Sequence, residues 1–226
     1  MYGADILARV RIAMNDTTST QRTPDTDLLN WLNDGISYIA SLRPDSMTIS
    51  GAQTLVSGTR QSLSDFVPKG QRLLDVYRSG NQAVRNIDRN ELDSMNPTWH
   101  GDTQAATITN FVYDDRDSST FWVYPPAASG ASIDCLYVPV VTPITLATVA
   151  QKLGLADAYI DCVTNYVLSR GYMKDSEDDA YLQLAMFYRK QCDDFLGQKN
   201  RTDLAFSPDT NSPGGVINKS AAVGGI

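Results

Sequence analysis

The feature that most constrains the fold is a change of hydrophobic period, which occurs twice along the chain. Apolar side chains recur with helical spacing near both ends of the sequence, whereas the middle consists of short runs rich in Val, Ile, Thr and aromatic residues. A helix brings every third or fourth side chain to the same face, whereas a strand brings every second one, so one segment cannot bury its apolar residues in both ways. The sequence therefore predicts two helical segments that flank a β-rich segment.

The N-terminal segment predicts two helices. One lies near residues 3–15, and a longer one takes Thr23 as its N-cap and Pro24 as its first residue. Pro44 ends the second helix, because the residue before a proline disfavours helical backbone angles. The apolar side chains of this second helix form one stripe: Leu28, Leu29, Leu32, Ile36, Ile39 and Leu42.

Residues 47–140 predict a β-rich unit. Runs such as "RLLDVYR", "TFWVYPP" and "ASIDCLYV" are separated by turn signals such as "PKG", "RSGN" and "DDRDSS". We expect a small antiparallel sheet or sandwich, with one or two helical turns at "DRNELDSM". Strand alternation predicts that Phe121 and Val123 lie on one face, and Trp122 and Tyr124 on the other.

Two further helices are predicted at "LADAYIDCVTNYVLSRGYMKD" and "SEDDAYLQLAMFYRKQCDDFL". Ser176 caps the second of these helices, and Gly197 ends it. The predicted fold class is α+β: N- and C-terminal helices form an antiparallel bundle that carries an inserted β-rich unit and an extended C-terminal arm. The expected boundaries are 1–46 for the N-terminal helices, 47–140 for the insertion, 141–197 for the C-terminal helices and 198–226 for the arm.

Composition narrows the classes of function. The net charge of -7 argues against a protein that grips nucleic acid, although an acidic wall could let DNA slide past. Cys135, Cys162 and Cys192 are odd in number and lack metal-site spacing, so we expect free buried thiols. The sequence shows neither a signal peptide nor an apolar stretch of membrane-spanning length, and we expect a soluble protein made in a cytoplasm.

Candidate chemistry is sparse. His100 is the one histidine, and its Gly- and Pro-flanked loop is more typical of a solvated side chain than of a general base. Asp114, Asp115 and Asp117 could ligate a divalent cation, but a turn between two strands explains them better. The chain contains no phosphate-binding or dinucleotide motif. We therefore expect no catalytic, cofactor-binding or metal-binding residues and no enzymatic activity.

Two alternatives remain open at this point. The first is a module that binds a glycan or another ligand through the aromatic β-rich unit, with Trp99 or Trp122 as an exposed platform. The second is a metal-dependent enzyme that uses the three aspartates of the "DDRD" run.

The sequence ends "FSPDTNSPGGVINKSAAVGGI", in which apolar residues stand singly or in pairs among Pro and Gly. Composition alone slightly favours an unbound terminus. The same pattern also suits an extended arm that places single anchors in the pockets of a partner. The candidate anchors are Leu204, Phe206, Pro208, Val216, Ile217, Val223 and Ile226.

Several segments taken together resemble a known family. The segments "LLNWLNDGISYIASLRPD", "FWVYPP", "CLYVP" and "YIDCVTNYVLSRGYMKDSED", in this order, are similar to the head-to-tail adaptor proteins of short-tailed bacteriophages. The resemblance covers roughly residues 1–197 and is most specific in the helix running into "LRPD" and in "NYVLSRGYMKDSED". It implies a helical bundle with a β-rich insertion, assembled as a dodecameric ring beneath the portal of the filled head.

The resemblance also implies partners. Residues 198–226 would be the arm that embraces the portal protein, and DNA would pass through the ring without sequence-specific binding. The opposite side would receive the tail or nozzle protein. The resemblance does not locate that contact; we expect it in the β-rich unit, at the turn with Asp114, Asp115 and Asp117, because loops are generic binding candidates. We therefore expect a structural protein of the virion neck, made in the host cytoplasm, with no cofactor and no membrane contact.

Overall fold

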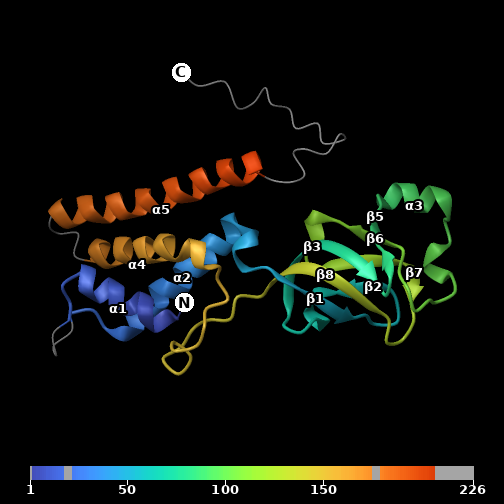
Figure 1. The fold of residues 1–226 in the computed structure, drawn as a ribbon, viewed down its shortest axis with the longest axis horizontal. Helices are drawn as coiled ribbons and strands as arrows, with labels where there is room; N and C mark the ends of the chain where they lie inside the picture. Colours follow the sequence, from blue (N-terminus) through green and yellow to red (C-terminus); the bar gives the residue numbers. More distant parts are fainter. Residues whose placement is uncertain (1, 18–21, 175–178, 207–226) are drawn as a thin grey trace, which may run out of the picture. The chain divides into compact units, whose positions relative to one another are not determined.

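The computed structural model describes residues 2–17, 22–174 and 179–206, which divide into two compact units (Figure 1). One unit combines Met1–Arg43 with Ile144–Ile226 and is helical in its described parts. The other, Pro44–Pro143, is rich in strands. Each unit has its own apolar core and is described separately below.

The helical unit is built around one central helix. Figure 1 shows α4 between α5 on one side and α1 and α2 on the other, and α4 packs against all three. Its core is filled by apolar side chains at helical spacing, such as Leu28, Leu32 and Val163, which are fully buried. The four helices are α1 (Gly3–Ala13), α2 (Asp25–Leu42), α4 (Ile160–Lys174) and α5 (Asp179–Phe206).

Close contact between α2 and α4 depends on a glycine. A Cβ atom added at Gly35 would lie 3.0 Å from Cδ1 and 3.5 Å from Cβ of Tyr166. Cδ1 belongs to the aromatic ring of Tyr166 and Cβ joins that ring to the backbone, so neither atom can move away easily. Gly35 therefore sets the distance between these two helices.

A disulfide joins Cys162 of α4 to Cys192 of α5, whose Cα atoms are 4.5 Å apart. The prediction of free thiols is wrong for this pair, because the fold brings together two cysteines that no local spacing relates. Cys135 is free and buried, as predicted. Burial raises the pKa of the Cys135 thiol to about 12, so this thiol is protonated at neutral pH.

Two helix ends differ from the prediction. α2 begins at Asp25 rather than at Pro24, which is its N-cap. α5 continues through Gly197 to Phe206, so the predicted end of the helix at Gly197 is wrong. A single glycine costs a helix interior only about 1 kcal/mol, which is too little to stop a long helix. The predicted cap Ser176 lies outside the described residues.

The β-rich unit contains two four-stranded sheets, with strand orders β1-β8-β3-β4 and β2-β7-β6-β5. A short helix, α3 (Arg89–Met95), forms at the predicted "DRNELDSM". The strands are β1 (Ile49–Thr54), β2 (Gly58–Ser62), β3 (Gly70–Ser79), β4 (Gln82–Ala83), β5 (Arg85–Asn86), β6 (Asn110–Tyr113), β7 (Thr120–Ala127) and β8 (Ser132–Pro139).

The predicted fold class, a helical bundle with a small β insertion, is wrong, although the content is α+β overall. The two sheets of four strands each make the β-rich unit a major part of the described chain. Nor is the pairing purely antiparallel, because β5 runs parallel to β6. Local sequence patterns could not reveal the number of strands in each sheet, because the sheets pair strands that are distant in the sequence. β1 pairs with β8 and β2 with β7, and Ile49 lies opposite Tyr137.

Residues of both sheets form one apolar core in this unit. Phe121 and Val123 of β7 are buried in that core, with exposed fractions of 0% and 1%. Trp122 and Tyr124 lie on the other face, where they pack against a second cluster that contains Trp99. The predicted alternation along β7 is confirmed.

Candidate functional site

The predicted arm lies largely beyond the described residues. Leu204 and Phe206 fall within α5, whose last side chains are not described. The remaining candidate anchors lie outside the described residues: Pro208, Val216, Ile217, Val223 and Ile226. Their role as anchors stays a prediction.

The predicted aspartate cluster forms a tight turn between β6 and β7. Residues Asp115–Asp117 make one 3-10 turn, which Asp114 caps by accepting a hydrogen bond from the backbone N–H of Arg116 at 3.0 Å. The Arg116 guanidinium also donates to both carboxylate oxygens of Asp114, with Nε 2.9 Å from Oδ1 and Nη2 2.6 Å from Oδ2. These bonds lower the pKa of Asp114 to about 2.

The carboxylates of Asp114 and Asp117 are therefore both engaged locally. Asp117 accepts a hydrogen bond from the Ser119 hydroxyl at 3.0 Å. Across the described ranges, no group of three or more His, Cys, Asp or Glu side chains is arranged to hold a metal ion. This geometry gives no support to the alternative of a metal-dependent enzyme.

The aromatic residues proposed as a ligand platform belong mainly to the second core of the β-rich unit. Trp99 is only 1% exposed, and its Nε1–H donates to Asp93 at 2.8 Å. His100 stacks on Trp99 with ring centroids 3.7 Å apart, and its Nδ1 lies 3.0 Å from Thr59 Oγ1. Trp122 is half-buried in the same cluster. Trp99 is thus a structural residue, not an exposed platform.

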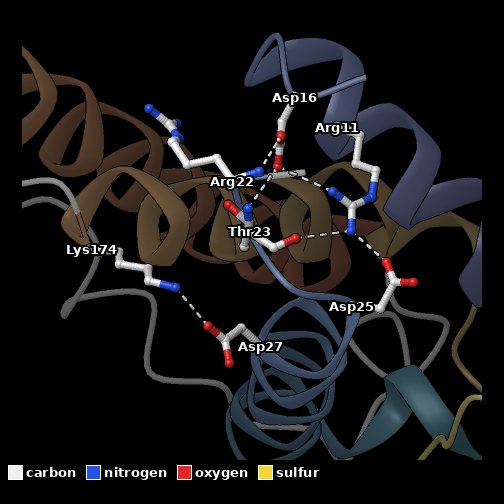
Figure 2. A network of polar contacts seen from close by, with 7 residues as sticks. All are labelled: Arg11, Asp16, Arg22, Thr23, Asp25, Asp27 and Lys174. Carbon is white, nitrogen blue, oxygen red and sulfur yellow. Dashed lines mark hydrogen bonds and ion pairs between the residues drawn. The ribbon is translucent and has the colours of Figure 1, made fainter. Parts of the chain in front are cut away.

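A polar network, which the sequence pattern did not reveal, fixes the connection between α1 and α2 (Figure 2). Asp16 is buried and accepts hydrogen bonds from the backbone N–H groups of Arg22 (2.8 Å) and Thr23 (3.0 Å). It also accepts one from Arg11 Nη1 at 3.1 Å. Arg11 in turn donates to the Thr23 carbonyl at 3.0 Å and to the Asp25 carboxylate.

The electrostatics of this network favour the ionised carboxylate. Burial alone would raise the pKa of Asp16, but the N–H groups of Arg22 and Thr23 and the Arg11 charge outweigh it and hold this pKa below its usual value. A separate ion pair, Lys174 Nζ to Asp27 at 2.7 Å, ties the end of α4 to the start of α2. The arrangement stabilises the helical unit and offers no group for catalysis.

A second polar cluster joins α2, α4 and α5. The Tyr38 hydroxyl donates to Asp193 at 2.8 Å, and Arg189 Nε donates to the same carboxylate at 3.2 Å. The Arg189 guanidinium lies 4.2 Å from the ring centroid of Tyr38 and 5.1 Å from that of Tyr166. Burial, followed by the bond to Asp193, raises the pKa of Tyr38. The phenol therefore stays protonated and can donate at neutral pH.

Next to this cluster, a groove of about 330 Å³ runs between α4 and α5. Apolar and basic side chains from the two helices line most of it: Arg170, Met173, Ala185, Met186, Arg189 and Lys190. Asp193 contributes a carboxylate to the same lining. Such a combination suits the binding of another protein surface better than it suits chemistry.

Comparison with known proteins gives one decisive match. The family model described as SU10 adaptor protein matches residues 1–213 of this chain. The chain belongs to the SU10 adaptor protein family. A search of curated proteins found no match.

Membership of this family confirms the predicted relation to phage head–tail adaptors. The adaptor is a structural component of a bacteriophage virion and associates with other virion proteins. Within the described residues of the adaptor, no helix is both long and apolar enough to cross a membrane. The groove and the exposed faces of the two units are thus candidate contacts with virion proteins.

Proposed function

We propose that this adaptor forms the neck of the virion, joining the portal of the DNA-filled head to the tail. Family membership is the observation that carries this proposal. The adaptor would work as a homo-oligomeric ring, a dodecamer by resemblance, and the genome would pass through its lumen. A net charge of -7 supports passage without sequence-specific binding, because an acidic wall repels phosphates.

The C-terminal arm, 198–226, is the proposed contact with the portal protein. α5 carries the first residues of this arm and runs to Phe206. Residues 207–226 follow, and at ~3.3 Å per residue such a length could extend over about 65 Å. This reach supports an arm that crosses from one protein to another, with Val216 and Ile217 as the central apolar anchors.

The turn formed by Asp114–Ser118 is the proposed contact with the tail or nozzle protein. Its backbone is held by the bonds between Asp114 and Arg116, whose guanidinium side chain is 91% exposed. A charged turn between two strands, held by its own hydrogen bonds, suits recognition by a partner. Replacing Asp117 by Lys should weaken attachment of the tail protein, whereas unchanged attachment would count against this face.

A binding experiment with purified portal protein from the same phage tests the central proposal. The full chain is compared with a chain that ends at Phe206, which keeps α5 whole, and with a Val216→Asp, Ile217→Asp double variant. We expect capture of the portal by the full chain alone. Equal capture by all three would locate the portal contact elsewhere on the adaptor, and no capture by any would refute the proposed role in joining the portal.

The adaptor has no enzymatic part in this proposal. It would be made in the host cytoplasm and incorporated into the virion at the neck. No specific observation favours a glycan-binding function, because Trp99 is buried in a core.

A further inference from the structure

Exposed apolar side chains lie along α5 in the described part of the chain. Among the described residues, this helix of 28 residues packs mainly against α4, so much of its circumference is not covered by them. Met186 and Phe187 are 62% and 53% exposed, and Leu184 beside them is also exposed. Met173 of α4 adds a fourth exposed apolar side chain. Met173 and Met186 lie together in the groove between α4 and α5, whereas Leu184 and Phe187 are not part of its lining. Exposed apolar side chains that meet as the two methionines do mark a contact with another protein.

The groove between α4 and α5 joins an apolar floor to a basic rim. Met173, Ala185 and Met186 supply the apolar part of its lining. Unbranched methionine side chains adapt their shape to an incoming surface, which suits a protein contact. The lining of the groove therefore offers both apolar area and charge to a partner.

The charge of the groove is opposite to that of the chain. Its lining holds three cations, Arg170, Arg189 and Lys190, against the single carboxylate of Asp193, whereas the whole chain carries a net charge of -7. The carboxylate is engaged by Arg189, and Arg170 lies 3.6 Å from Asp34 across a half-exposed pair. Lys190 remains exposed at the rim. The groove thus attracts an acidic surface.

We propose that this groove is the surface at which a second copy of the adaptor docks. The proposal rests on the ring put forward above, which requires copies of one acidic chain to associate. Two acidic chains repel one another unless a local patch of opposite sign brings them together. The basic groove is such a patch, and the acidic exterior of a second copy is its complement.

The sign of the groove also decides the kind of contact. In a two-fold dimer the same patch meets itself, so two linings that each carry more cations than carboxylates would face one another. This repulsion disfavours the symmetric pair and favours a head-to-tail contact, in which the groove of one copy meets a different, acidic face of the next. A head-to-tail contact that repeats with a constant rotation closes into a ring.

The test measures assembly in Met186→Glu and Lys190→Glu variants of the full chain. Both substituted side chains are exposed, so both variants should fold, which circular dichroism checks. Lys69→Glu, in the β-rich unit, changes the net charge as much as Lys190→Glu does and serves as the control. Assembly is followed by analytical ultracentrifugation of the free chain and by native mass spectrometry of the chain bound to purified portal protein.

We expect the natural chain to assemble beyond a monomer in at least one of these settings. Met186→Glu should weaken assembly by about tenfold or more, because it puts a charge on the apolar floor, and Lys190→Glu should weaken it because it reverses a charge at the rim; the control should not weaken it. If the groove variants assembled as the natural chain does, the groove would be refuted as the docking surface, but the proposal of a ring would stand. A natural chain that stays monomeric even on the portal would refute both.

Discussion

Replacing Asp16 by alanine should remove a large part of the stability of the helical unit. The carboxylate of Asp16 is the common acceptor for two backbone N–H groups and for Arg11, and its side chain is only 5% exposed. An alanine leaves all three donors without this acceptor. The connection between α1 and α2 then loses a buried group that bonds to both of its ends (Figure 2).

The size of the effect follows from which donors can find another partner. Arg22 is exposed, so its N–H can turn to water, but Thr23 is 2% exposed and its N–H stays buried. A buried donor without an acceptor costs about 1–3 kcal/mol. Arg11 keeps the Thr23 carbonyl and Asp25, so it loses less than the 3–5 kcal/mol typical of breaking a fully buried pair. We expect a loss of about 3 kcal/mol.

Urea unfolding followed by far-ultraviolet circular dichroism measures this loss, because most helical residues belong to the helical unit. Asp34→Ala is the matched control, since its partner Arg170 lies 3.6 Å away and both side chains are about half exposed. Such a surface pair contributes about 0–1 kcal/mol. If Asp16→Ala lowered the free energy of unfolding no more than Asp34→Ala does, the assigned role of the network would be refuted.

The pH dependence gives a second check on the same residue. The pKa of Asp16 in the folded chain lies below its ordinary value of 3.8, so the folded state favours the ionised form. Its stabilisation is therefore complete above pH 3.8 and is lost as the pH falls through the folded pKa. The stability difference between the natural chain and Asp16→Ala should be constant near neutral pH and should shrink in acid.

Three further predictions concern the helices. Reducing the Cys162–Cys192 disulfide, which closes a loop of 30 residues, should lower the free energy of unfolding by about 3–4 kcal/mol on the chain-entropy model; equal melting temperatures with and without dithiothreitol would contradict this. Gly35→Ala should destabilise the helical unit by about 1–2 kcal/mol, because the new Cβ lies 3.0 Å from the Tyr166 ring and forces the packing to shift. Gly197→Ala, where the added Cβ meets nothing within 4 Å, should instead stabilise α5 by up to about 1 kcal/mol, so thermal unfolding of the two variants should move in opposite directions.

Local patterns predicted the local structure well. The stripe from Leu28 to Ile39 identified α2, because a helix with one buried face must repeat its apolar residues at that spacing. The alternation of Phe121 and Trp122 identified the two faces of β7 for the same kind of reason. Both signals depend only on neighbours in the sequence, which is why they needed no knowledge of the fold.

Features that depend on distant residues were missed. The pairing of β1 with β8 and the disulfide between α4 and α5 exist because the fold brings distant segments together. The role of Asp16 was also hidden, since "NDTTSTQRTPDT" has the composition of an ordinary polar loop and nothing in it reveals that one carboxylate is buried. The α4–α5 groove was missed because Arg170 and Lys190 belong to different helices.

Added salt should affect the α4–α5 groove and the Asp16 network of the helical unit differently. Screening acts over a Debye length of about 10 Å at 0.1 M and about 3 Å at 1 M, and it affects exposed charges far more than buried ones. Assembly through the groove should therefore weaken between these salt concentrations, because Lys190 is exposed, whereas the stability lost in Asp16→Ala should change little. Suppose instead that assembly resists salt but is still abolished by Met186→Glu. The contact would then be mainly apolar, the repulsion that disfavours a two-fold pair would be weak, and the argument for a head-to-tail ring contact at this groove would fail.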